Sequence, residues 1–232
     1  MPAGVLTSGA VERSFGNSMS EYSVGIEDHY AWANFVSVTT SGSDDILLDR
    51  RRVALLGQNL TGSPYHGEAV HMPLSDAEKL VREVTASANA HAKLALSALI
   101  AELAPATCRG IAIRVPPLAE WPQTVAEVEA NTWIRNRADG MIYHHALTQA
   151  AAQLDITVFH FEKDTVLEAA AQIRGRSTDD FERQLKAFGK RLGPPWRQGH
   201  VVACAAAILA HVSGAARSSI GPATEGALPS RS

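Results

Sequence analysis

The sequence predicts an α/β fold in which a mixed sheet of five strands has helices on both faces. Residues 22–56 form three short apolar runs separated by polar residues, which is typical of consecutive antiparallel strands. From Ser75 the spacing of apolar residues changes from two to 3.6, and strand-like and helix-like segments then alternate. Because parallel strands need crossover connections, the order βββ-α-β-α-β-α requires helices on both faces.

The first three strands lie at the N-terminal end. An apolar run at 24–26 is interrupted at Glu27-Asp28-His29 and resumes at Trp32–Val38. The segment TTSGSDD from Thr39 predicts a turn. A third strand is expected around Asp49–Arg52, between two further apolar runs. These segments predict an antiparallel meander.

A long helix is expected after the meander. Ser75 and Glu78 have the spacing of a capping box, and the apolar period continues as far as Leu103, before Pro105. The run from Gly110 to Val115 is apolar on both faces, as a central parallel strand would be.

The remaining elements alternate. Thr124 and Glu127 form a second capping box, which opens a helical stretch to Leu154 with an expected interruption near residues 136–140. Ile156–Phe161 is the predicted fifth strand. Three further helices are expected at residues 164–173, 178–192 and 199–212.

Composition limits the class of protein. The chain has 232 residues, 46% hydrophobic and 19% charged, with a net charge of -3, which indicates one globular domain rather than a collagen or a coiled coil. We expect a single domain over residues 22–212 and disordered tails at 1–21 and 213–232. Without a long apolar run or a secretory signal, no membrane contact and a cytoplasmic location are expected. The two cysteines predict neither a disulfide framework nor a zinc site.

The element order resembles that of the ribonuclease H-like superfamily, and within it the bacterial Holliday-junction-resolvase branch. Two segments carry the resemblance. SVGIEDHYAWANFVSV places Glu27 where that branch has an acid on its first strand, and WRQGHVVACAAAILA resembles its last helix. The chain also resembles a bacterial protein group that shares the segments EDH, PYHGE and LGPPW, a likeness that implies no activity. The first resemblance implies nucleic acid as partner and Mg²⁺ or Mn²⁺ as cofactor.

Glu27 is the candidate metal ligand that the resemblance implies. Successive strand residues point to opposite faces, so only one of Glu27 and Asp28 can face a given site. The alternative is that Glu27 pairs with an arginine of the third strand, among Arg50, Arg51 and Arg52. The fourth strand has Arg114 where the branch has a second acid. Glu120 would replace that acid as a metal ligand only if the Pro116-Pro117 loop folds back.

His200 is the second candidate catalytic residue. The last predicted helix has no acid between Arg197 and Val212, so His200 would act as metal ligand or general base. The alternative is a structural histidine. We expect Glu27, His200 and the loop of Tyr65, His66 and Glu68 to converge at the carboxyl end of the first strand.

The loop after the third strand has two further interpretations. His66, Glu68 and His71 are residue types that bind Zn²⁺, which would make the chain a hydrolase of another kind. Alternatively, the segment is an ordinary solvated loop. Tyr65, His66 and Glu68, together with Asp28, are otherwise candidates for residues that support the Glu27 site.

A basic segment precedes the last helix. Lys190, Arg191 and Arg197 offer cations for phosphates and Trp196 a ring for stacking, although acids upstream would balance an ordinary solvated face. Three functions therefore remain open. The first is a domain whose acidic site is incomplete or altered and which binds or hydrolyses structured nucleic acid. A homodimer is one form that this domain could take. The second is a non-catalytic scaffold or partner-binding protein of the same fold, and the third is the His66/Glu68/His71 hydrolase.

Overall fold

The computed structural model describes residues 21–219. Within this range the strands form one five-stranded sheet. The strands are β1 (Glu21–His29), β2 (Trp32–Ser41), β3 (Asp44–Ala54), β4 (Thr107–Arg114) and β5 (Val158–Phe161). Their order is β3-β2-β1-β4-β5; β1 pairs antiparallel with β2 and parallel with β4. The predicted α/β fold class, with a mixed five-stranded sheet, is confirmed.

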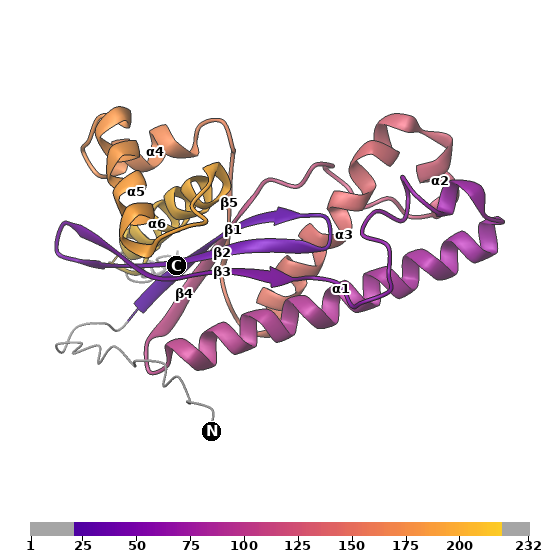
Figure 1. Cartoon of the computed structure of the whole chain (residues 1–232), viewed down its shortest axis with the longest axis horizontal. Helices are drawn as coiled ribbons and strands as arrows, with labels where there is room; N and C mark the ends of the chain where they lie inside the picture. The colour runs from indigo at the N-terminus through magenta and orange to yellow at the C-terminus, as the bar shows by residue number, and fades with distance from the viewer. Residues whose placement is uncertain (1–20, 220–232) are drawn as a thin grey trace, which may run out of the picture.

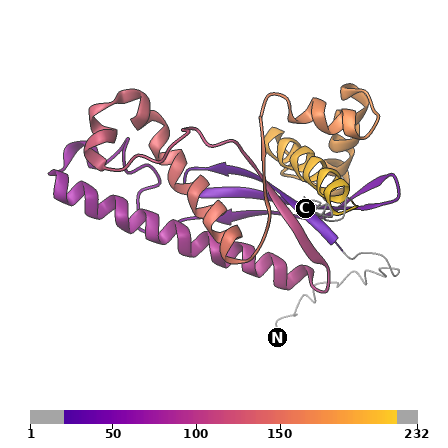
Figure 2. The same cartoon turned by 180° about the vertical axis from the view of Figure 1, so that it is seen from behind.

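Helices cover both faces of the sheet (Figures 1 and 2). The helices α1 (Leu74–Leu103) and α3 (Thr132–Gln153) pack on one face, whereas α4 (Val166–Ile173), α5 (Thr178–Leu192) and α6 (Gln198–Ser219) lie on the other. Two short helices, η1 (Ala69–His71) and α2 (Val125–Ala130), lie with the start of α1 and the start of α3 beyond the end of the sheet. No helix within residues 21–219 is long and apolar enough to cross a membrane.

Side chains of β1 alternate between two separate cores. Tyr22, Val24 and Ile26 are fully buried in the core shared with α1 and α3. The intervening positions face α6, and at one of them a side chain on Gly25 would place its Cβ atom 1.7 Å from the carbonyl oxygen of Ala203. The backbones of β1 and α6 are therefore in direct contact. This contact brings the start of α6 to the carboxyl end of β1.

Local differences from the sequence predictions have identifiable causes. The predicted break at residues 27–29 is wrong, because Glu27, Asp28 and His29 continue β1 opposite the first residues of β2. A two-residue turn at Tyr30-Ala31 joins the strands. At the start of α1 no side chain caps the helix, so the predicted capping box of Ser75 and Glu78 is also wrong.

The helices after β4 agree with the sequence predictions in part and differ from them in their bounds. Thr124 caps α2 as predicted, since its Oγ1 accepts from the backbone N–H of Glu127 at 3.1 Å. The interruption lies at Asn131, whose side chain caps α3, and not at residues 136–140. The last helix continues to Ser219, so the domain boundary predicted at residue 212 falls inside it. Residues 1–20 and 220–232, where most of both tails were predicted, lie outside the described residues.

Candidate functional site

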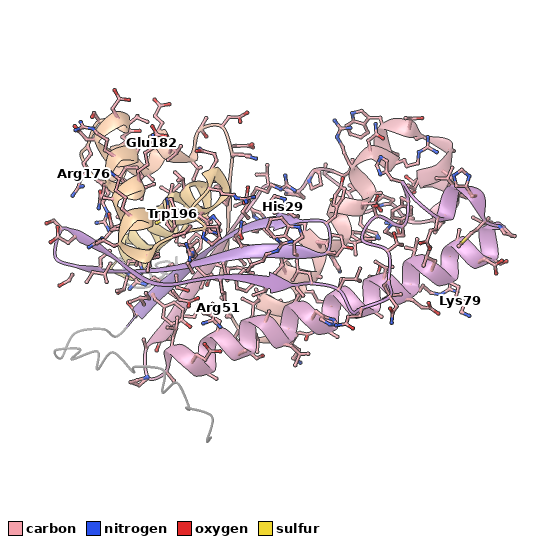
Figure 3. All side chains as sticks on the ribbon, in the orientation of Figure 1. His29, Arg51, Lys79, Arg176, Glu182 and Trp196 are labelled. Carbon is pink, nitrogen blue, oxygen red and sulfur yellow. The ribbon has the colours of Figure 1, made fainter. Side chains whose placement is uncertain are left out.

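A surface pocket of about 440 Å³ opens at the carboxyl ends of β1 and β4. The hairpin of β1 and β2 forms one side of it, and β5 with the start of α6 forms the other. Figure 3 shows His29 at this end of β1, between the group of α4, α5 and α6 and the group of α2 and the start of α3. The residues that line the pocket are Ile26, Glu27, Asp28, His29, Tyr30, Trp32, Arg114, Phe161, Lys163 and Val202.

Asp28 and Arg114 form a two-pronged ion pair in this pocket. The Nε atom of Arg114 donates to Oδ1 of Asp28 at 2.9 Å, and Nη2 donates to Oδ2 at 3.3 Å. The Asp28 side chain is 1% exposed and the Arg114 side chain 36% exposed. The carboxylate is therefore buried beneath the guanidinium. Arg114, which was expected to repel a metal ion, instead neutralises the acid beside Glu27.

Glu27 points to the opposite face of the sheet, toward α6. Its Oε2 accepts from the side-chain amide of Asn34 at 3.0 Å and lies 3.1 Å from Nε2 of His29. The carboxylate also occupies the space beside Gly199, where an added Cβ would lie 1.6 Å from Oε2. Since the first turn of a helix carries a partial positive charge, α6 favours this carboxylate. The alternative pairing with an arginine of β3 is not formed.

His200 lies one residue beyond Gly199 and is buried. Its Nδ1 accepts from the backbone N–H of Arg197 at 3.1 Å, and its ring stacks on Trp196 with ring centroids 5.6 Å apart. Burial and the nearby Arg50 lower the pKa of His200, although Glu27 raises it. His200 therefore lies near Glu27 as a neutral ring that is bound within its own helix turn.

The residues present do not fit a two-metal site. Glu27 and Asp28 face opposite sides of the sheet, and each carboxylate already has partners. Glu120 is exposed on the loop that continues into Trp121, which lines a different pocket against α1. Across residues 21–219, no group of three or more His, Cys, Asp or Glu side chains could hold a metal ion. Glu27 and Glu120 as metal ligands therefore gain no support from the geometry.

Sequence reasoning missed an aromatic stack at the hairpin. His29 and Trp32 face each other across the turn, with ring centroids 3.9 Å apart and planes inclined by 12°. The guanidinium of Arg52 lies over the other face of Trp32, 3.8 Å from its centroid. A two-residue turn makes its flanking residues direct partners, so the spacing of His29 and Trp32 was the available signal.

The loop of Tyr65, His66 and Glu68 does not converge with Glu27. The backbone N–H groups of Tyr65 and His66 donate to the carboxylate of Asp139, and Nδ1 of His66 lies 2.8 Å from it. This arrangement fixes the loop on α3, across the sheet from α6. Burial raises the pKa of Asp139, and the hydrogen bonds to Asp139 and Asn136 raise the pKa of His66. The predicted site that joined this loop to Glu27 is wrong, because a buried acid on α3 binds the loop.

The basic segment before α6 is partly used for packing. Trp196 covers Gly189 of α5, where a Cβ would lie 2.3 Å from the indole, and stacks on His200. Arg191 lies over the ring of Phe188. Arg191 is nevertheless exposed, as are Lys190 and Arg197. The segment therefore offers three solvent-facing cations, but not the open tryptophan ring that we expected.

Comparisons with known proteins were made for the whole chain. No protein-family model matches the chain, and no curated protein matches it. Among solved structures, it is similar to Thermus thermophilus RuvC in complex with a Holliday junction substrate, with a TM-score of 0.47, 13% identity, and coverage of 85% of this chain and 96% of that one. A second Thermus thermophilus RuvC structure gives a TM-score of 0.47, 12% identity and the same coverage. The fold class follows from this chain's own strand order and pairing.

Proposed function

We propose that this chain is a nucleic-acid-binding domain of ribonuclease H-like fold, which binds the phosphate backbone at the carboxyl ends of β1 and β4 without hydrolysing it. The observation that carries the proposal is the Asp28–Arg114 pair. The carboxylate of Asp28 is 1% exposed and fixes the guanidinium through Nε and Nη2. The Nη1 group of Arg114 takes no part in this pair, so it is the group that we expect to donate a hydrogen bond to a phosphate oxygen.

The contact between His29 and Glu27 in the same pocket has a similar arrangement. The His29 side chain is 38% exposed, whereas that of Glu27 is 14% exposed. In both pairs the acid is the more buried member and the nitrogen base the more exposed one. Lys163, also in the lining, is exposed, and so is Arg52 above Trp32. The surface therefore presents donors to an anion even though the chain as a whole has a net charge of -3.

The acids support binding rather than hydrolysis. A metal-dependent nuclease needs clustered carboxylates that are open to two cations. In this pocket Asp28 is neutralised by Arg114, and Glu27 is bound by Asn34 and the start of α6. These partners support a role for both acids in positioning the β1 end, the first by fixing Arg114 and the second by fixing α6 against the strand.

Fluorescence anisotropy with labelled duplex, four-way junction and single-stranded DNA tests the proposal. We expect micromolar or tighter binding at low salt, with log K falling against log salt at a slope of about -2 to -3 if three cations contact phosphates. Lys163→Glu should weaken binding roughly tenfold, because the residue is exposed and takes no part in the pairs at the pocket. Lys79→Glu on α1, far from His29 in Figure 3, is the matched control.

A second experiment separates binding from hydrolysis. Unlabelled and end-labelled DNA are incubated with the protein in Mg²⁺, Mn²⁺ or chelator, and the melting temperature is followed in the same buffers. We expect no cleavage and no stabilisation by either cation. Cleavage that is lost in Glu27→Gln would show that the site hydrolyses nucleic acid. Absence of binding to every DNA form would favour the non-catalytic scaffold, and zinc-dependent hydrolysis lost in His66→Ala the third hypothesis.

A further inference from the structure

One face of α3 continues the surface of the pocket beyond the sheet. Tyr30, which lines the pocket, is 44% exposed, and the edge of its ring lies 3.7 Å from the position of a Cβ on Gly140. Residues 133, 137 and 140 share one helical face, because their directions differ by no more than about 60° at 100° per residue. Tyr30, Arg137 and Trp133 therefore lie along one line, which we call the α3 stripe.

The aromatic rings of the α3 stripe are unusually accessible. Trp133 is 57% exposed, which exceeds the 44% of Tyr30. Arg137 lies over one face of its indole, 4.3 Å from the centroid, and Nη1 of Arg137 donates to the carbonyl oxygen of Trp133 at 3.1 Å. The guanidinium thus holds the indole from one side and leaves the other side for a ligand.

The charge of α3 also favours an anion. Its sequence, TWIRNRADGMIYHHALTQAAAQ, contains one acid, Asp139, whose side chain is 0% exposed and bound to the loop at Tyr65 and His66. The two arginines of the helix, Arg135 and Arg137, are both partly exposed. No exposed carboxylate of α3 therefore opposes a phosphate beside the stripe. A flat ring next to a guanidinium is the combination that binds a base and its phosphate together.

We propose that the α3 stripe binds the unstacked bases of a single-stranded nucleic acid whose backbone continues into the pocket. This inference rests on the proposed function. The seven steps from Trp133 to Gly140 rise about 10 Å at 1.5 Å per residue, well above the roughly 3.4 Å that separates stacked neighbours in a duplex strand, so bases on Trp133 and on Tyr30 would be held apart from each other. A paired duplex cannot use the stripe, because its base faces are already stacked on one another.

The inference is tested by comparing oligothymidine, oligouridine and a blunt duplex of equal charge in anisotropy titrations of the full chain. Trp133→Ala should raise the dissociation constant for the single strands roughly tenfold, the loss expected for one stacked base. The dissociation constant for the duplex should change less than twofold. Trp133→Phe, which keeps a ring, should recover part of the loss. Leu94→Ala, at a 67% exposed apolar side chain of α1, is the matched control.

The possible failures are distinguishable. If Lys163→Glu weakens binding but Trp133→Ala does not, the α3 stripe is wrong and the proposed function stands. If Trp133→Ala weakens single-strand and duplex binding equally, the preference for unstacked bases is overturned. If no nucleic acid binds, or Lys163→Glu has no effect on any of them, the proposed function fails and the inference with it. A larger loss with oligouridine than with oligothymidine would identify RNA as the ligand.

Discussion

On the α1 and α3 face, β1 presents Tyr22, Val24 and Ile26, whereas on the α6 face the same strand presents Gly25 and Glu27. The first face fills its core with large side chains, each fully buried. On the second face β1 contributes almost no apolar side chain, because the helix backbone rests on the strand at Gly25 and the carboxylate of Glu27 fills the space at Gly199. The first face should therefore suffer mainly when volume is removed, and the second when volume is added.

The largest expected effect is that of Gly25→Ala. The added methyl group would lie 1.7 Å from the carbonyl oxygen of Ala203 and 2.9 Å from the backbone nitrogen of Ala207. Backbone atoms cannot rotate away, so α6 would have to move off the sheet. We expect a loss of about 3 kcal/mol or more in the free energy of unfolding, measured by urea denaturation.

A matched control adds the same methyl group to α3. In Gly140→Ala the nearest atoms, of Pro117 and Tyr30, lie 3.6 and 3.7 Å away, which is ordinary contact. We expect no loss and a gain of up to about 1 kcal/mol from the higher helix propensity of alanine. Equal stability of the two variants would show that α6 does not rest on β1 as described.

The second expected effect concerns Arg114→Gln, which leaves the buried carboxylate of Asp28 without its cation. We expect a loss of about 2 kcal/mol, less than for a fully buried pair because the guanidinium is 36% exposed. The double variant Asp28→Asn/Arg114→Gln removes the charge as well and should recover about half of the loss. Urea denaturation near pH 7 measures both. A double variant no more stable than the single one would show that the pair is not what fixes the end of β1.

A smaller effect is expected from Ile26→Val, on the strand residue next to Gly25 but on the other face. Removal of one methyl group from a fully buried side chain should cost about 1 kcal/mol. Its ratio to the loss in Gly25→Ala compares the two faces directly. The comparison fails if the isoleucine variant is the less stable of the two.

The sequence predicts the scaffold well because its signals are local and periodic. The period of two in residues 22–56 and the period of 3.6 after Ser75 each follow from one face of an element being buried. The strand order could then be inferred from the handedness of crossovers. The terminus of β1 was missed because three polar residues, Glu27, Asp28 and His29, ended the apolar run while their backbone still paired with β2.

The candidate site was predicted only in part. Alternation along a strand allows an acid to be assigned to one face, and the Glu27 carboxylate lies on the α6 face of β1, whereas His200, the partner expected for it, is bound within its own helix turn. The partners of Glu27 were not predicted, since Asn34 of β2 and Gly199 of α6 are brought to it by tertiary packing. The pairing of Asp28 with Arg114 joins residues 86 apart in sequence, and the anchoring of the 63–68 loop by Asp139 joins residues more than 70 apart. No spacing rule covers such distances.

The smallest expected effect is a dependence of stability on pH at the His66–Asp139 contact. This contact joins the loop of residues 63–68 to α3, on the α1 and α3 face of the sheet. The hydrogen bond to Asp139 raises the pKa of His66 above its ordinary 6.5. A raised folded-state pKa means that the stabilisation is fully present below about pH 6.5 and is lost as the pH rises through the folded value. The buried His144, His200 and His211 have lowered pKa values and act with the opposite sign, weakening the fold as the pH falls.

The difference in unfolding free energy between wild type and His66→Gln isolates the contribution of His66, because His144, His200 and His211 are present in both proteins. We expect the wild type to be the more stable of the two at pH 5.5, and the advantage to shrink steadily toward pH 8.5 as His66 loses its proton and Asp139 loses its cationic partner. Glutamine keeps a hydrogen-bond donor for Asp139, so the variant tests the charge rather than the contact. Urea denaturation across this range measures the difference. An advantage that is constant with pH would mean that His66 binds Asp139 as a neutral ring throughout.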